Sequence, residues 1–239
     1  MSDVSVGVVI AVRDGARYLG EALDSVLAQD PVPDEVVVVD DGSTDDLASV
    51  LERYPAPVRY VRQEPMGIPI ALNRGIAECR ADVLAFCDAD DLWTPGKQAA
   101  QIAALHADPD CEGVTGQVQQ FVSPELATDR VVRNLHDRAM PARLLGAMLL
   151  RRDAFDRVGP FDEGLAHLAN LDWFSRADQR GLRLCSVDTI VLLRRVHDAN
   201  LGLLDRSGAR TDMLEVLRRD RRRRKGRRAS PDANPSDHR

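Results

Sequence analysis

The chain has 239 residues, of which 44% are hydrophobic and 29% are charged. This balance is typical of a soluble globular protein and excludes a chain that is disordered along most of its length. No apolar stretch approaches the ~20 residues that span a bilayer, and the first residues, Met1 to Asp3, lack the basic head of a signal peptide. We therefore expect a cytoplasmic protein.

The four cysteines, Cys79, Cys87, Cys111 and Cys185, include no C-x-x-C pair. This spacing argues against both a zinc knuckle and a disulfide framework. The sequence therefore predicts reduced thiols.

Charge is unevenly distributed. Residues 218–239 contain ten Arg or Lys and three Asp, a net charge of +7, so residues 1–217 must carry −13 to reach the total of −6. An acidic body lacks the basic face of a nucleic-acid-binding domain, so we expect no specific nucleic-acid partner. We interpret residues 218–239 as a basic, disordered tail whose charge would allow weak contact with the inner face of a membrane.

The first hundred residues alternate between strand and helix patterns. Runs rich in β-branched residues predict strands at residues 4–11, 36–39, 58–61 and 83–87. Apolar residues at helical spacing and helix-start signals predict helices near residues 18–27, 47–51, 69–79 and 94–106. This alternation predicts an α/β fold with a Rossmann-like, doubly wound, mostly parallel sheet flanked by helices.

The second half is less regular. We predict strands at residues 112–121, 147–150 and 189–196, and helices at residues 153–158 and 170–180. No Gly-, Ser- or Pro-rich linker separates the two halves, so residues 1–217 are predicted to form one domain.

Two acidic clusters follow predicted buried strands. Asp40 and Asp41 follow the second strand, and Asp88, Asp90 and Asp91 follow the fourth. Ligands of parallel α/β sheets bind at this carboxyl edge, and a D-x-D pair of hard oxygen ligands suits Mg²⁺ or Mn²⁺. Each cluster alone also fits an aspartate-rich turn before a helix. Their combination is more specific than either one.

These motifs, in this order, resemble a family 2 glycosyltransferase. The resemblance covers roughly residues 4–200 and rests on several segments: VVIAVRD (8–14), SVLAQ (25–29), VDDGSTD (39–45), ALNRGI (71–76), AFCDADDLW (85–93), RRDAF (151–155), VGPFDE (158–163) and DWFSR (172–176). It implies a GT-A fold, a nucleotide-diphosphate sugar donor and a divalent metal. The nucleotide-binding half would then be about residues 1–110 and the acceptor half about residues 111–217.

The resemblance also implies roles for residues of the nucleotide site. Asp41 matches the residue that contacts the uracil imide, with Asp40 nearby on the nucleoside. Ala11 and Arg13 lie on the first strand-end loop, which contacts the nucleotide in this family. Asp88 of the D-x-D motif is expected to face both the nucleotide and the metal.

The metal, Mg²⁺ or Mn²⁺, would be held by the D-x-D pair, with Asp90 as the more direct ligand beside Asp88. His197 follows the last predicted strand and resembles a C-terminal histidine that reaches the metal or diphosphate in many GT-A enzymes. A surface histidine in a polar loop is the alternative interpretation.

The pattern breaks where the family carries Glu-Asp, because the aligned residues are Ala169-Asn170. The missing aspartate is the residue that deprotonates the acceptor, and an amide has no basic lone pair. Three explanations stay open: Asp172 serves as the base, the acceptor is already anionic, or the protein binds donor with little turnover. We favour the first because Asp172 lies in the matching segment. Asn170 also fits a helix cap.

The resulting prediction is a metal-dependent, inverting glycosyltransferase of the hexosyltransferase type that uses a nucleotide-sugar donor, with UDP as the expected nucleotide. Its acceptor is open between a saccharide, a lipid phosphate and a peptide. The alternative is a catalytically weak or inactive sugar-nucleotide-binding or scaffold protein, because of Asn170. A dinucleotide-binding dehydrogenase is disfavoured, since no G-x-G-x-x-G follows the first strand.

Overall fold

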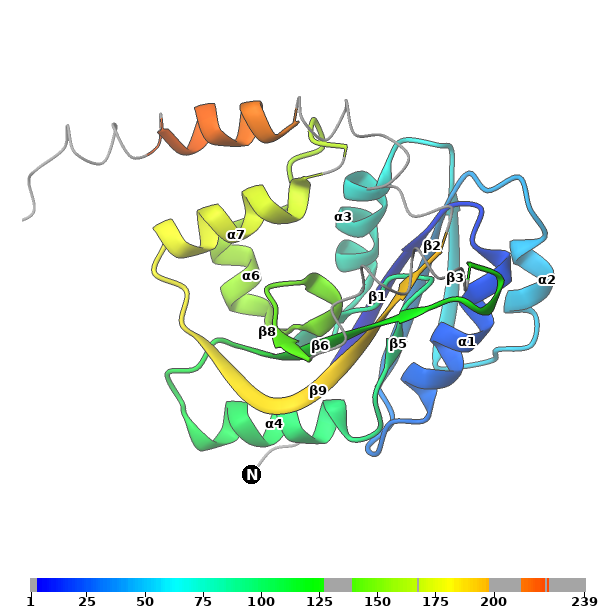
Figure 1. Cartoon of the computed structure of the whole chain (residues 1–239), viewed down its shortest axis with the longest axis horizontal. Helices are drawn as coiled ribbons and strands as arrows, with labels where there is room; N and C mark the ends of the chain where they lie inside the picture. Colours follow the sequence, from blue (N-terminus) through cyan, green and yellow to red (C-terminus); the bar gives the residue numbers. More distant parts are fainter. Residues whose placement is uncertain (1–3, 127–138, 167, 198–211, 222, 224–239) are drawn as a thin grey trace, which may run out of the picture.

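The computed structural model describes residues 4–126, 139–166, 168–197, 212–221 and 223. Its centre is a nine-stranded sheet in the order β3-β2-β1-β4-β8-β6-β9-β5, with β7 paired to β6. Helices cover both faces of this sheet (Figure 1). The predicted α/β class with a doubly wound sheet is confirmed.

The first half of the chain forms the parallel part of the sheet. Its strands are β1 (Val6–Val12), β2 (Glu35–Asp41), β3 (Val58–Gln63) and β4 (Val83–Phe86). Its helices are α1 (Ala16–Leu27), α2 (Leu47–Leu51), α3 (Ile68–Glu78) and α4 (Lys97–Ala107). β1 pairs in parallel with both β2 and β4, so it lies between the two strands that end in acidic clusters.

Alternate residues of β1 and β2 explain why these strands are valine-rich. Val8 and Val36 pack into the core on the side of α1, whereas Val9 and Val37 pack into the core on the side of α3. Because both faces of the strands are covered, the central positions along them require apolar side chains.

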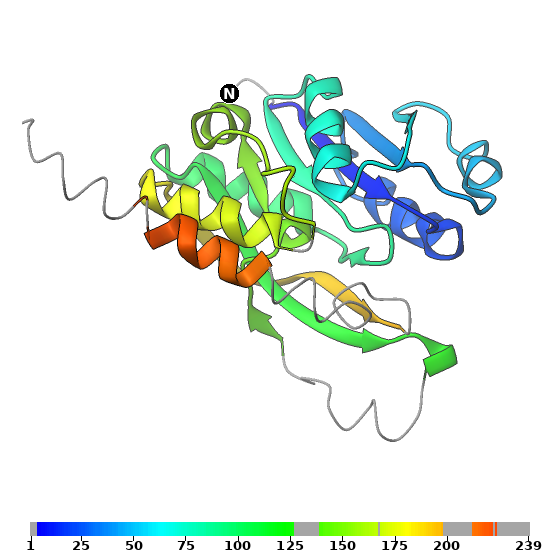
Figure 2. The same ribbon diagram turned by 90° about the horizontal axis from the view of Figure 1, so that it is seen from above.

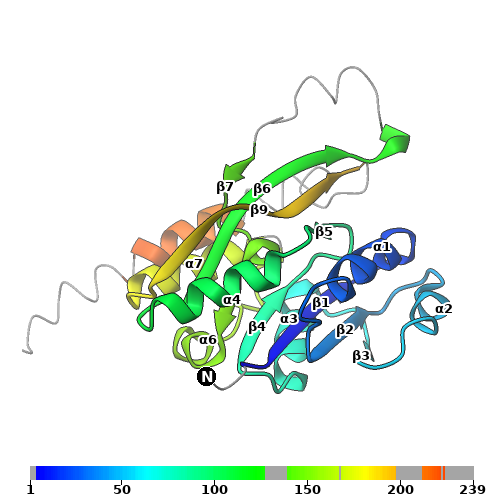
Figure 3. The same cartoon turned by 90° about the horizontal axis from the view of Figure 1, so that it is seen from below.

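The second half adds strands of mixed direction: β5 (Leu92–Trp93), β6 (Gly113–Val122), β7 (Met140–Pro141), β8 (Leu149–Arg151) and β9 (Leu184–Val196). Its helical elements are α6 (Arg152–Val158), α7 (Ala169–Gln179) and the short 3-10 turns η1 (Pro124–Leu126) and η2 (Leu145–Ala147). β8 is antiparallel to β4 and β6, whereas β6 and β9 are parallel. The long β6 and β9 run side by side away from the parallel part (Figures 2 and 3).

The cysteine prediction is wrong for one pair. Cys111 and Cys185 form a disulfide with a Cα–Cα distance of 6.0 Å, across 74 positions of sequence. The parallel register of β6 and β9 brings them together, because Val114 lies opposite Cys185. Cys79 and Cys87 are buried free thiols.

The predicted boundary at residue 217 falls inside a helix. Residues 212–221 are helical, and Val216 is only 3% exposed in the core cluster that also contains α7 residues. The start of the predicted basic tail is therefore folded; residues 224–239 lie outside the described residues. Within the described part of the chain, no helix is long and apolar enough to cross a membrane.

Candidate functional site

The D-x-D cluster lies where β4 ends. Asp88, Asp90 and Asp91 each offer a carboxylate oxygen, and these atoms lie within 4.8 Å of one another. Asp88 is exposed, Asp90 is half-buried and Asp91 is buried. This donor set, oxygen only and partly open to solvent, fits a hard divalent cation such as Mg²⁺ or Mn²⁺.

The carboxylates of this cluster repel one another. Although the Asp88 residue is exposed, the surrounding protein and then the charge of Asp90 raise the pKa of its carboxyl group to about 6. Burial, followed by the charges of Asp88 and Asp90, raises the pKa of Asp91 well above its ordinary value. The guanidinium of Arg194 acts against both shifts. The group as a whole would be stabilised by a further positive charge.

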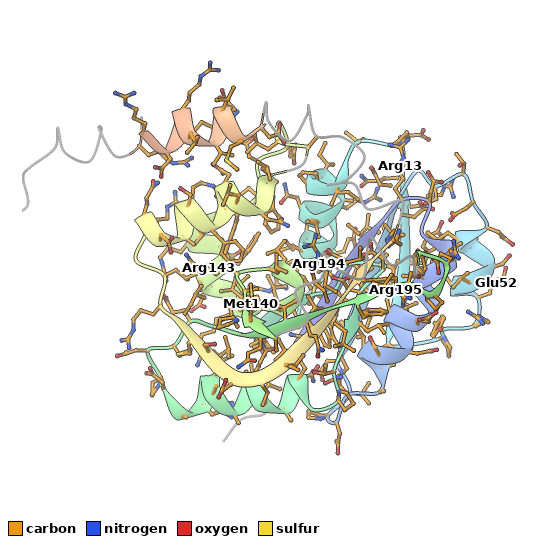
Figure 4. All side chains as sticks on the ribbon, viewed as in Figure 1. Arg13, Glu52, Met140, Arg143, Arg194 and Arg195 are labelled. Carbon is orange, nitrogen blue, oxygen red and sulfur yellow. A yellow bond between two sulfur atoms is a disulfide. The ribbon has the colours of Figure 1, made fainter. Side chains whose placement is uncertain are left out.

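Arg195 of β9 fixes the backbone and one carboxylate of this cluster. Its main-chain N–H donates to Asp91 Oδ1 at 2.8 Å, and its Nε donates to the Asp90 carbonyl oxygen at 2.9 Å. Figure 4 marks Arg194 and Arg195 on this part of β9. Since β9 is far from β4 in sequence, the site is complete only when both halves of the chain are folded.

The Arg195 side chain is itself held between aromatic rings. Its guanidinium carbon lies 4.7 Å from the ring centroids of both Tyr18 and Phe121. It also donates to Glu21 Oε2 at 2.6 Å, and only 4% of the side chain is exposed. No local sequence signal marks Arg195, Tyr18 and Glu21 as neighbours, because their convergence depends on the packing of α1 against the end of β9.

His197 lies beside the cluster. Its Nε2 is 2.8 Å from Asp90 Oδ2, and its ring centroid is 4.7 Å from that of Tyr18. The residue is buried. The structure therefore joins Asp88, Asp90 and His197 in one place, which a surface histidine in a polar loop would not do.

The second acidic cluster, at the end of β2, is satisfied by the protein itself. Asp41 Oδ1 accepts hydrogen bonds from Gln63 Nε2 and the Met66 N–H, both at 2.8 Å, and its Oδ2 accepts from the Gly67 N–H at 2.7 Å. Asp41 has no exposed surface. In this conformation its carboxylate fixes the loop after β3.

Asp40 is equally enclosed. Its Oδ1 accepts from the Ser43 N–H at 2.7 Å, and its Oδ2 accepts from Tyr60 Oη at 2.7 Å and from Arg62 at 2.9 Å. Burial acts to raise the pKa of Asp40, but the hydrogen bonds from Ser43 and Tyr60 hold this pKa below its ordinary value. Asp40 therefore remains ionised and anchors the turn that follows β2.

The loops after β1 and β2 are tied together next to these residues. Asp14, with φ of 52°, accepts from the Thr44 N–H at 2.7 Å, and its own N–H donates to Ser43 Oγ at 2.9 Å. About half of the Arg13 side chain is exposed at this edge. Ala11, within β1, is partly buried. β1 lies between β2 and β4, so their acidic ends are two strand-to-strand steps apart. This corresponds to a distance of roughly 10 Å.

The candidate base residues occupy a different environment. Asp172 is 1% exposed; its Oδ2 accepts from Arg176 Nε at 2.8 Å, and its Oδ1 accepts two bonds from Arg223 at 3.0 Å. This geometry argues against Asp172 as an acceptor base, because two cations hold its charge inside the protein. Asn170 is exposed as the second residue of α7, and the helix cap is Leu168, so Asn170 is not a cap.

A sheet of this order, with carboxylates at the end of β4, defines a GT-A-type fold. TarS of S. aureus superposes with a TM-score of 0.68 at 18% identity, over 90% of this chain and 64% of that chain. A mannosyltransferase from Pyrobaculum calidifontis, solved with GDP-Man and Mn²⁺, superposes with a TM-score of 0.67 at 21% identity, over 98% of this chain and 67% of that one.

The family model described as "Glycosyl transferase family 2" matches residues 7–161, and the chain belongs to this family. An uncharacterized glycosyltransferase of Rickettsia typhi is 30% identical over 81% of this chain and 64% of its own length. The succinoglycan biosynthesis protein ExoU of Rhizobium meliloti is 27% identical over 91% of this chain and 74% of its own length. The chain thus spans less than two thirds of the length of the Rickettsia relative.

Proposed function

We propose that the chain is a metal-dependent glycosyltransferase that transfers a sugar from a nucleotide-diphosphate donor, with inversion at the anomeric carbon. The observation that carries this proposal is the group of three carboxylates within 4.8 Å, with His197 beside Asp90, at the carboxyl edge of a family 2 fold. Structural neighbours were solved with UDP, with UDP-GlcNAc, and with GDP-Man and Mn²⁺.

Asp88 and Asp90 are the residues that would hold Mg²⁺ or Mn²⁺, because they are the two carboxylates of the cluster with exposed surface. When bound, a divalent cation neutralises a diphosphate and makes it a better leaving group. The hydrogen bond from the Arg195 N–H to Asp91 holds the loop after β4 in place. His197 borders the site next to Asp90 and would contact the metal or the diphosphate.

The nucleotide would lie along the ends of β1 and β2, where Ala11 and the half-exposed Arg13 are placed. Asp40 and Asp41 support this region by fixing its loops. A direct contact between Asp41 and a uracil imide would require the Met66 and Gly67 N–H groups to release the carboxylate. We propose UDP-sugar as the donor, and GDP-sugar is the alternative to be tested.

The acceptor is proposed to be one that needs no strong base. Asn170 cannot take a proton, and Asp172 is held by two arginines. An anionic acceptor such as a lipid phosphate meets this requirement. A lipid-linked sugar is the alternative acceptor: an Escherichia coli relative, 35% identical over 49% of this chain, is named as a beta-1,3-galactosyltransferase acting on alpha-D-GlcNAc-diphosphoundecaprenol, in which a sugar hydroxyl is the acceptor group.

The surroundings of Asn170 and Asp172 also favour a second candidate function. This is a sugar-nucleotide-binding protein with weak turnover. Asn170→Asp separates the two candidates, since a lost general base typically costs about 10²–10⁴-fold. A rise in transfer of about a hundredfold or more would identify a weakened enzyme with a repairable site. No change would support an acceptor that needs no base.

Nucleotide release from a panel of UDP- and GDP-sugars, with Mn²⁺, Mg²⁺ or EDTA, tests the activity itself. We expect metal-dependent release in the wild type and its loss in Asp90→Asn. Asp156→Asn is the matched control, because Asp156 is an exposed aspartate of α6. If the protein binds a donor but releases no nucleotide with either metal ion, this would contradict the transferase and support the binding protein.

A further inference from the structure

Among the described residues, the helix of residues 212–221 contacts the body through one of its sides. Val216 inserts into the core. Asp220 Oδ1 accepts from Ser175 Oγ at 2.8 Å and from Gln179 Nε2 at 2.6 Å, both on α7. Figures 1 and 2 show this helix, in orange, lying alongside α7 at the outside of the molecule. Its opposite side faces outward.

That outward side combines apolar and basic side chains. Leu214 and Leu217 are each 57% exposed, and Met213 is 40% exposed. Arg218 and Arg221 are also exposed. At 3.6 residues per turn, all of these except Met213 fall within an arc of about 100°, and Met213 borders it. We call these five residues the outer face.

This clustering is unusual for the molecule. Across the described residues, eight large hydrophobic side chains are exposed, and three of them belong to this one helix. Scattered exposed apolar residues need no explanation, whereas a group on an outward helix face indicates an interaction surface.

We propose that the outer face binds the surface of a bilayer that contains anionic lipid. Interfacial helices combine Leu or Met with Arg on their outward side, so that apolar side chains enter the lipid boundary while guanidinium groups meet the headgroups. Nucleic acid would engage the arginines and would leave the leucines without a partner.

Charge complementarity supports an anionic surface as the occupant. Residues 218–239 have a net charge of +7, whereas residues 1–217 carry −13. An anionic bilayer therefore attracts the end of the chain that holds the outer face and repels most of the remaining body. This proposal is independent of the catalytic proposal, and its test uses no donor or activity.

The test is flotation of the full chain with phosphatidylcholine vesicles, with and without phosphatidylglycerol. We expect binding to the anionic vesicles only, and weaker binding as salt increases, because a Debye length of about 10 Å at 0.1 M shortens at higher ionic strength. Leu217→Asp should reduce binding about tenfold or more, since it places a charge in the lipid boundary. Binding to neither vesicle overturns the proposal.

Val32→Asp is the matched control, because Val32 is 51% exposed and lies outside this helix. It should bind vesicles like the wild type, and circular dichroism should show that both variants remain folded. Equal binding by wild type and Leu217→Asp would contradict a role for the outer face. If Leu217→Asp instead dissociates a dimer of a wild type that ignores vesicles, the face contacts a second copy and the proposal is wrong.

A charge variant separates the two contributions. Arg218→Glu with Arg221→Glu should weaken vesicle binding and reduce its salt dependence, whereas Arg53→Glu, at an exposed arginine near α2, should leave both unchanged. Wild-type vesicle binding that is equally strong without phosphatidylglycerol would overturn the anionic-lipid assignment.

Discussion

The carboxylates at the end of β2 and those just after β4 lie at the same edge of the sheet and differ in their surroundings. Asp41 accepts three hydrogen bonds from the protein and has no exposed surface. Asp88, by contrast, is exposed and lies within ligand-sharing distance of Asp90, and its pKa is raised to about 6.

The difference separates two uses of the same residue type. A carboxylate that the protein already satisfies holds a loop, whereas a crowded carboxylate at a solvent edge has capacity left for a cation. Asp172 belongs with the first group, because Arg176 and Arg223 satisfy it. Sequence motifs alone do not distinguish the two uses.

Asp172→Asn should give the largest loss of stability. The substitution leaves the mostly enclosed Arg176 and Arg223 without their shared counter-charge, and we expect the free energy of unfolding to fall by about 3 kcal/mol. Urea denaturation measures this loss. Nucleotide release per folded molecule should stay within a few-fold of wild type; a stable variant with lost turnover would instead make Asp172 the base.

Asp41→Asn should lower stability by about 2 kcal/mol, because the new amide presents a donor to backbone N–H groups that need an acceptor. Thermal or urea unfolding checks the change against Asp156→Asn, which should match the wild type. A variant as stable as the wild type, with weakened UDP binding, would show that Asp41 serves a ligand rather than the loop.

Lys97 is a fully buried amine whose charge state in the folded protein can be tested. Its Nζ donates to Gln101 Oε1 at 2.6 Å, and burial lowers the pKa of Lys97 to about 7. Between this value and the unfolded pKa of about 10.4, the unfolded state binds a proton that the folded state lacks. Stability should therefore rise with pH in this range, by about 1 kcal/mol per pH unit.

Urea denaturation of wild type and Lys97→Met between pH 7 and 9 measures this slope. The difference between the two proteins is the quantity of interest, since it removes the titration of the other groups. Parallel curves would show that Lys97 stays charged in the folded protein.

Asp88→Asn should give the smallest effect, and in the opposite direction to Asp41→Asn. Removing one of three crowded charges relieves repulsion, so the metal-free variant should melt slightly higher than the wild type. The gain should shrink when Mn²⁺ is added, because the ion stabilises the wild type more. A lower melting temperature without metal would mean that Asp88 is already satisfied.

Much of the fold follows from the sequence. The valine-rich runs of β1 and β2 predict strands buried on both faces, and the alternation with apolar helices predicts a parallel sheet. Boundaries were less accurate: α4 begins at Lys97 after Gly96 in a left-handed conformation, while Thr94 Oγ1 donates to the Ile190 carbonyl oxygen. Because the Thr94 hydroxyl donates to β9, it does not cap α4.

The site was predictable where its parts follow one strand, and less so where distant elements meet. The D-x-D cluster follows β4 directly. The resemblance to the family pointed to His197 as a further residue of the site. The roles of these residues in binding a metal or a diphosphate stay predictions. Arg195 depends on how β9 lies against α1 and the D-x-D loop. The Cys111–Cys185 pair and the Asp172–Arg223 ion pair likewise depend on long-range packing that local spacing does not encode.

The most direct test of the central claim is a calorimetric titration of Mn²⁺ into the wild type and Asp90→Asn, with and without UDP. We expect one ion per chain in the wild type, tighter binding with UDP, and loss of that site in Asp90→Asn, while Asp41→Asn keeps it. Mn²⁺ binding of equal affinity in wild type and Asp90→Asn would contradict the assignment of the carboxylates after β4 as the metal site.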